Sequence, residues 1–121
     1  MTNQLPKVED EDLSVFVKWT EFITWLFPHT EKFPKRARFT LASRIENLAL
    51  DIIEDLIEAR YSREKLAILK RANLRLEKMR ILLRLSHGFQ YLSTKSYEYA
   101  VKILNETGRM IGGWVKQLEK R

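Results

Sequence analysis

Residues 94–121 constrain the fold more than any other part of the chain, because their apolar side chains recur at steps of three and four. The series runs Tyr97, Val101, Leu104, Gly108, Ile111, Val115 and Leu118. At about 3.6 residues per turn, side chains with this spacing share one face of an α-helix. The stretch therefore predicts a long helix with one face in a helical core.

Two further sets of side chains follow the same predicted helix. Cations recur every seven residues and are expected to form one outward ridge, Lys95, Lys102, Arg109 and Lys116. A third set is apolar and occupies the remaining flank, Tyr99, Ile103, Met110 and Trp114. Because a lone bundle needs only one apolar face on each helix, we expect the third set to contact another subunit.

The rest of the chain has the composition of an all-helical domain. It contains only three prolines and four glycines, and all except three glycines of the last helix fall near predicted helix ends. We predict one all-α domain over residues 1–121, an antiparallel up-down four-helix bundle, and the second apolar faces of its helices lead us to expect a homo-oligomer. The helices are expected at about residues 12–27, 35–59, 63–87 and 94–120, after an acidic N-terminal arm at residues 1–11.

The first predicted helix is apolar nearly all round. Pro28 is expected to end this helix at Phe27, because the residue before a proline avoids helical backbone angles. A helix this apolar is either deeply enclosed or shared with a neighbouring subunit, and we expect Trp19 and Phe22, on its second apolar face, at the subunit contact. The predicted inner face is Leu13, Phe16, Thr20, Ile23 and Phe27.

Carboxylates line the outer face of the second predicted helix. They lie opposite an apolar seam, so we interpret them as a solvated face that can pair with cations of a neighbouring subunit. This position argues against acid–base catalysis, which needs carboxylates held together away from water. The carboxylates are Asp51, Glu54, Asp55 and Glu58, and the seam is Leu41, Ile45, Leu48, Ile52 and Leu56.

The third predicted helix carries two apolar sides. One is the core stripe, and the other includes Leu74, Ile81 and Leu85, which we expect to lie against another chain. The cations of this helix divide into two groups that are candidates for anion contacts. The first group is Arg71, Arg75 and Lys78, and the second is Arg80 and Arg84. Salt bridges between subunits are the alternative role for both groups.

The charge of the chain is unevenly distributed. Residues 1–59 contain 7 basic and 11 acidic side chains, a net charge of −4, whereas residues 60–121 contain 15 basic and 5 acidic ones, a net charge of +10. A basic surface built by the second half of the chain favours a polyanionic partner, nucleic acid ahead of anionic lipid.

Signatures of catalysis and of metal or cofactor binding are missing from the sequence. There is no cysteine, the two histidines fall in predicted loops, and no phosphate-binding loop, nucleophile elbow or metalloprotease motif occurs. No apolar run approaches the ~20 residues of a membrane span, and the N-terminus is unlike a signal peptide. We therefore expect a cytoplasmic, non-enzymatic protein without cofactor, metal or membrane partner.

Four segments resemble a known family. They are residues 25–28 (WLFP), 33–38 (FPKRAR), 79–84 (MRILLR) and 108–116 (GRMIGGWVK). Together they are similar to the four-helix-bundle proteins that include the accessory variability determinant (Avd) of diversity-generating retroelements. The same superfamily contains proteins encoded in 23S ribosomal RNA intervening sequences.

The resemblance implies a homopentameric barrel with a basic exterior that binds nucleic acid and the reverse transcriptase of the retroelement. That complex makes adenine-mutagenised cDNA from a template-repeat RNA. Arg80 and Arg84 match two arginines of the family's third helix, and Arg109 and Lys116 lie in the matching C-terminal segment. The arm before Val15 has no clear counterpart.

Two functions of different classes remain open. The first is an accessory protein that binds a reverse transcriptase and, without reading bases, RNA and DNA. Its candidate binding residues are Arg71, Arg75, Lys78, Arg80, Arg84, Lys95, Lys102, Arg109 and Lys116. The second is an oligomeric interaction module of the ribosomal-insert type, whose cations contact only acidic protein surfaces. In both, the expected subunit contacts are Trp19, Phe22, Leu74, Ile81, Leu85, Tyr99, Ile103, Met110 and Trp114.

Overall fold

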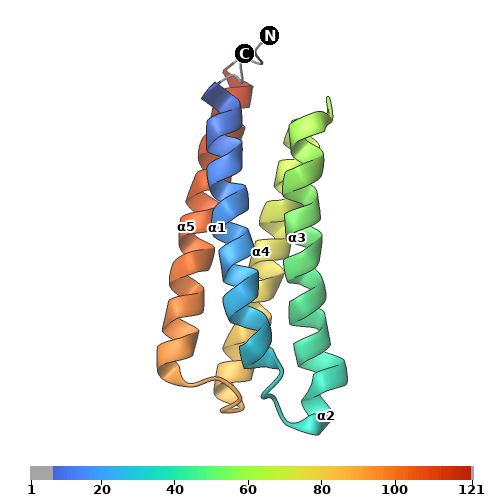
Figure 1. The fold of residues 1–121 in the computed structure, drawn as a ribbon, viewed down its shortest axis with the longest axis vertical. Helices are drawn as coiled ribbons and strands as arrows, with labels where there is room; N and C mark the ends of the chain where they lie inside the picture. The colour runs from blue at the N-terminus through green and yellow to red at the C-terminus, as the bar shows by residue number, and fades with distance from the viewer. Residues whose placement is uncertain (1–6, 121) are drawn as a thin grey trace.

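Four long helices run alternately up and down in the structure, a computed structural model that describes residues 7–120 (Figure 1). The elements are α1 (Lys7–Thr30), α2 (Lys35–Ala37), a π-helical turn (Arg38–Ala42), α3 (Ser43–Tyr61), α4 (Lys65–Gly88) and α5 (Thr94–Glu119). The long helices pack in the cyclic order α1, α3, α4, α5, so the face between α1 and α5 lies opposite the face between α3 and α4. This arrangement confirms the predicted all-α four-helix bundle.

The predicted N-terminal arm overlaps the start of α1. The backbone is already helical at Lys7, so residues 7–11 belong to α1. Residues 1–6 and the side chains of residues 7–12 lie outside the described part of the chain. None of the helices in the described part is long and apolar enough to cross a membrane.

The C-terminal end of α1 differs from the prediction, because the helix continues through Pro28 to Thr30. A proline inside a helix removes one backbone hydrogen bond. Side chains hold the last turn together here: His29 Nδ1 lies 2.8 Å from the Trp25 carbonyl oxygen, and the buried Thr30 donates its hydroxyl to Glu46 at 2.5 Å. Tertiary contacts thus outweigh the local preference to stop.

The predicted inner face of α1 is wrong. The buried side chains are Val15, Trp19, Phe22 and Leu26, and the indole N–H of Trp19 donates to the Ala49 carbonyl oxygen at 2.9 Å. Both faces of α1 are apolar, so periodicity alone could not decide between them. Trp19 and Phe22, expected at a subunit contact, therefore belong to the core of the single chain.

The buried face of α5 is rotated relative to the predicted seam. Small side chains, Ala100 and Thr107, lie at its centre and bring Ile103 and Trp114 into the core. Counting large apolar residues missed this centre. Ile103 and Trp114, expected at a subunit contact, are thus enclosed within one chain.

A π-helical turn interrupts the helix predicted at residues 35–59. Ala37 and Ala42 are both buried although they are five residues apart. A π-turn brings positions five apart onto one face, whereas an α-helix would turn one of them outward. The turn leaves Arg38 and Phe39 exposed at the end of the bundle.

Side chains also fix the tight connection between α3 and α4. The Ser62 hydroxyl accepts the backbone N–H of Glu64 at 2.9 Å. Lys65 Nζ donates to the carbonyl oxygens of Ala59 and Arg60 at 2.7 and 2.9 Å. Carbonyl groups at the end of α3 that lack helical partners are satisfied in this way, and α4 begins antiparallel to α3.

Candidate nucleic-acid interface

A ridge of four cations lies along the outer face of α5. All four side chains are exposed, and none lies within salt-bridge distance of a carboxylate in residues 13–120. The ridge consists of Lys95, Lys102, Arg109 and Lys116. Because the helix repeats this position every seven residues, successive cations are spaced by ~10 Å, a spacing suited to phosphates of an extended strand.

Arg80 on α4 lies against α5. Its Nε donates to Glu77 at 3.0 Å, one Nη donates to the Asn105 side-chain oxygen, and the other lies 3.4 Å from the Leu104 carbonyl oxygen. A Cβ added at Gly108 would lie 3.5 Å from this second Nη, an ordinary van der Waals distance, so the guanidinium lies close above the glycine. Arg80 is therefore fixed in position, with its side chain 26 % exposed.

A groove surrounds the Arg80 guanidinium between α4 and α5. Its volume is about 500 Å³, and the ridge residue Arg109 forms part of its wall. The groove thus connects Arg80 of α4 to the ridge residue Arg109 of α5. Its other lining residues are Asn73, Leu76, Glu77, Asn105 and Gly108.

Arg84 and Lys78 lie on different sides of α4. Arg84 is exposed one turn beyond Arg80, and it has no carboxylate within salt-bridge distance in the described part of the chain. Lys78 is also exposed, but it borders a second groove between α3 and α4, with Arg44 and Asp51 across from it. Only Arg84 therefore extends the basic surface of α5.

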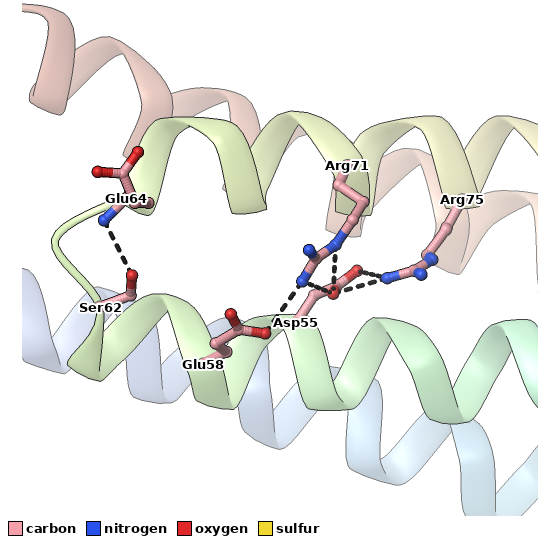
Figure 2. Close-up of polar contacts among 6 residues, drawn as sticks. All are labelled: Asp55, Glu58, Ser62, Glu64, Arg71 and Arg75. Carbon is pink, nitrogen blue, oxygen red and sulfur yellow. Dashed lines mark hydrogen bonds and ion pairs between the residues drawn. The ribbon is translucent and has the colours of Figure 1, made fainter.

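The structure places Arg71 and Arg75 in an ion-pair cluster with α3 (Figure 2). Arg71 donates from Nε and Nη2 to Asp55 Oδ1 at 3.0 and 2.7 Å, and Nη2 also reaches Glu58 at 3.0 Å. Arg75 Nη1 contacts both Asp55 oxygens at 2.7 Å. The hydrogen bond and charge of Asp55 raise the pKa of Arg71 above its ordinary value. These two arginines join helices within one chain, which corrects their assignment to the candidate binding set.

Asp55 is the centre of that cluster and differs most from its prediction. Its side chain is 2 % exposed, whereas we expected a solvated carboxylate. The sequence does hold a signal: Asp55 lies three residues after Ile52 and four before Ala59, both of which are buried. A carboxylate at a core spacing needs cationic partners, and Arg71 and Arg75 are four residues apart on the next helix.

A second interhelical ion pair, missed by the sequence reasoning, joins α1 to α5. Lys18 Nζ lies 2.8 Å from Glu106 Oε1. The hydrogen bond from Lys18 is the main cause that lowers the pKa of Glu106, and the charges of Lys102 and Arg109 lower it further. Glu106 is thus a carboxylate set among cations, and it reduces the positive potential at the middle of the ridge.

Five of the residues expected at a subunit contact do lie at the surface of the single chain. Leu74, Ile81 and Leu85 are exposed on α4, and Tyr99 is exposed on α5, while Met110 is half-buried. Leu74, Ile81 and Leu85 form a line on the outer side of α4. Tyr99 and Met110 belong instead to the face between α1 and α5, on the opposite side of the bundle.

The sequence model of the bAvd-like family matches residues 14–118, which include most of all four long helices. The chain belongs to the bAvd-like family. Membership indicates an accessory role in diversity-generating retroelements, and the family is one of non-catalytic proteins. Searches of curated proteins and of solved structures found no match.

Proposed function

We propose that this bAvd-like protein binds the reverse transcriptase and the template RNA of its retroelement and takes part in mutagenic retrohoming without catalysing a reaction itself. The observation that carries the proposal is the basic surface of α4 and α5, on which Arg84 and the α5 ridge have no carboxylate partners within the described residues. An exposed row of unpaired cations favours a phosphate chain over a single small anion.

The arrangement supports binding to the nucleic-acid backbone. The ridge cations are long, exposed side chains on one helix, and such contacts position a strand without identifying its bases. Affinity should therefore vary little with sequence and fall steeply with salt, with a log–log slope of roughly −0.7 per phosphate engaged on a single strand.

We also propose that copies of the chain assemble into a pentamer. The line formed by Leu74, Ile81 and Leu85 on α4 exposes apolar surface that a second copy can cover. Five copies at +6 each carry a formal charge of +30, which would attract a polyanion strongly at low salt. Size-exclusion chromatography with light scattering measures this assembly, and a particle of 14.4 kDa would contradict it.

Fluorescence anisotropy with a labelled RNA tests the binding proposal. Lys102→Ala together with Lys116→Ala should weaken binding and reduce the salt slope by one to two phosphates. Lys32→Ala together with Lys35→Ala is the matched control, because both residues are exposed on the connection from α1 to α3 and do not belong to the ridge. Equal effects of the two double variants, or a binding constant that does not change with salt, would refute the proposal.

The α4 arginines separate this function from that of an oligomeric interaction module. If Arg80 and Arg84 serve nucleic acid or the polymerase, Arg80→Ala/Arg84→Ala should keep the oligomer and lose binding. If they serve subunit contacts, the oligomer itself should dissociate. Because Arg80 also bonds to α5, Arg84→Ala alone is the cleaner variant, and a thermal melt confirms that each variant is folded.

A further inference from the structure

An aromatic cluster lies between α1 and α5, next to the cationic ridge. The Trp25 ring stacks on His29 with centroids 4.0 Å apart, and it meets Tyr99 of α5 at 4.7 Å. Trp25 and His29 are half-buried, whereas Tyr99 is 41 % exposed. The cluster therefore presents the Tyr99 ring to solvent on a rigid support of two further rings.

Cations flank the exposed ring on both sides. Lys95 precedes Tyr99 by about one helical turn, and Lys102 follows it by about one turn. Both lysines are exposed and have no salt-bridge partner in the described part of the chain. Positions three and four apart on a helix are surface neighbours, with Cβ atoms ~5–6 Å apart. The Tyr99 ring thus lies within reach of two phosphate-binding side chains.

A groove continues this surface along α1 and α5. Its volume is about 390 Å³, and it is lined by Lys18, Glu106, Arg109 and Met110. Arg109 lies ten residues after Tyr99, a rise of ~15 Å along the helix. Three acidic residues, Glu21, Glu98 and Glu106, share this region with the cations, and Glu106 is paired with Lys18. The surface thus continues from Tyr99 along α5, with cations at both ends.

We propose that the face between α1 and α5 binds single-stranded nucleic acid by stacking an unpaired base on Tyr99 while Lys95 and Lys102 contact the adjacent phosphates. This inference rests on the proposed nucleic-acid binding and names its substrate class. In a duplex the bases stack on one another and their faces are inaccessible, so only an unpaired base can use the ring. Stacking accepts any base, which agrees with binding that is independent of sequence.

The arrangement also separates this face from the apolar line on α4. Tyr99 was expected at a subunit contact, but it lies on the opposite side of the bundle from Leu74, Ile81 and Leu85. In a ring of five copies the α4 line contacts a different patch of the next copy, so the proposal requires that this second patch lies away from Tyr99. A purely structural role for the cluster needs only the buried parts of the Trp25 and His29 rings, and it does not explain an exposed ring between two unpaired lysines.

The test compares a labelled oligo-dT 12-mer with a 12-base-pair blunt duplex in anisotropy titrations at matched salt. Tyr99→Leu should weaken single-strand binding roughly tenfold, since stacking of one base is worth 1–3 kcal/mol. Duplex binding should change less than twofold, and Tyr99→Phe should behave like the parent because it keeps the ring. Tyr61→Leu is the matched control, an exposed tyrosine at the end of α3.

Tryptophan fluorescence gives a second readout that needs no substitution of Tyr99. Trp19 and Trp114 are buried, so quenching by a bound base reports on Trp25. The single strand should quench the parent protein and the duplex should not. Lys95→Gln/Lys102→Gln should weaken the binding of both the single strand and the duplex, because both carry phosphates.

The outcomes distinguish the two proposals. If single strand and duplex bind alike, with no quenching and no effect of Tyr99→Leu, base stacking is refuted while nucleic-acid binding stands. If neither ligand binds in a salt-dependent way, the proposed function fails and this inference fails with it. If Tyr99→Leu melts at the parental temperature but no longer binds either ligand, stacking is also contradicted, because this variant should still bind the duplex.

Discussion

We expect the loss of the Asp55 carboxylate to destabilise the bundle more than the loss of any exposed charged side chain. Asp55 is 2 % exposed and accepts hydrogen bonds from both Arg71 and Arg75. Deleting one partner of a fully buried ion pair costs about 3–5 kcal/mol, because the remaining charge is left uncompensated. Here the arginine side chains are 44 % and 27 % exposed, so water can solvate them after the change. We therefore expect Asp55→Ala to cost about 2 kcal/mol.

Urea unfolding followed by circular dichroism measures this value, at two protein concentrations so that any assembly is detected. A loss of 2 kcal/mol corresponds to a fall in melting temperature of roughly 8 °C for a domain of this size. Arg71→Ala should cost only about 1 kcal/mol, because Arg75 still contacts both oxygens of Asp55. Asp51→Ala is the matched control on the same helix, since Asp51 is half-buried and has no ion pair in the described chain.

A change in the free energy of unfolding for Asp55→Ala within ~0.5 kcal/mol of that for the Asp51→Ala control would contradict this prediction. A double-mutant cycle with Arg75→Ala isolates the pair, and a coupling energy below ~0.5 kcal/mol would show that the close contact adds nothing. The triple change Asp55→Leu/Arg71→Met/Arg75→Met should recover most of the stability, because it removes the unpaired charges together.

Three smaller predictions concern α5. The pKa of Glu106 should lie below its ordinary value of 4.5 in an NMR titration and rise toward 4.5 in Lys18→Met. Because the pKa of Glu106 is lower in the folded state, the ion pair stabilises the fold at pH values above the pKa of the unfolded state. This stabilisation is lost as the pH falls through the pKa of the folded state. Lys18→Met should therefore make the free energy of unfolding depend less on pH in this acid range. Thr107→Val should raise stability by about 1 kcal/mol in urea unfolding, since the buried Thr107 hydroxyl has no hydrogen-bond partner among the described residues; a loss of stability would contradict this. Gly112→Ala should stabilise the helix by up to ~1 kcal/mol, because an added Cβ meets no atom of the described residues within 4 Å, and weaker RNA binding or assembly in that variant would reveal a partner close to the backbone.

The sequence was sufficient to predict where the long helices lie, but not which face of each helix is buried. Apolar spacing identified four long helices and the outward position of the α5 ridge, because periodicity records which side chains share a face. It could not choose the inner face of α1, where Val15 and Trp19 compete with Phe16 and Ile23 on an almost uniformly apolar helix. In α5 the centre of the core is formed by small residues that an apolar count ignores.

Charge was harder to interpret than apolar spacing, for a physical reason. A run of cations shows neither which of them point at a neighbouring helix nor whether that helix offers a carboxylate. Asp55 pairs with Arg71 and Arg75, so these arginines are not available to a partner. Asn105 and Glu77 hold Arg80 in place by hydrogen bonds. Such pairings depend on the relative rotation of two helices, which no single helix specifies.

The pairing of α3 with α4 also determines where the positive potential of the protein is concentrated. Carboxylates of α3 neutralise Arg71 and Arg75 of α4, as the cluster in Figure 2 shows. Arg80, further along α4, turns toward α5, where the charges of Lys102 and Arg109 act on Glu106. The same ion pairs that hold the bundle together leave Arg84 and the ridge cations without a carboxylate partner among the described residues, on the side formed by α5 and the C-terminal half of α4. A change such as Asp55→Asn should then affect stability strongly and the salt dependence of RNA binding only slightly, because the arginines that it releases face α3 and not this basic side.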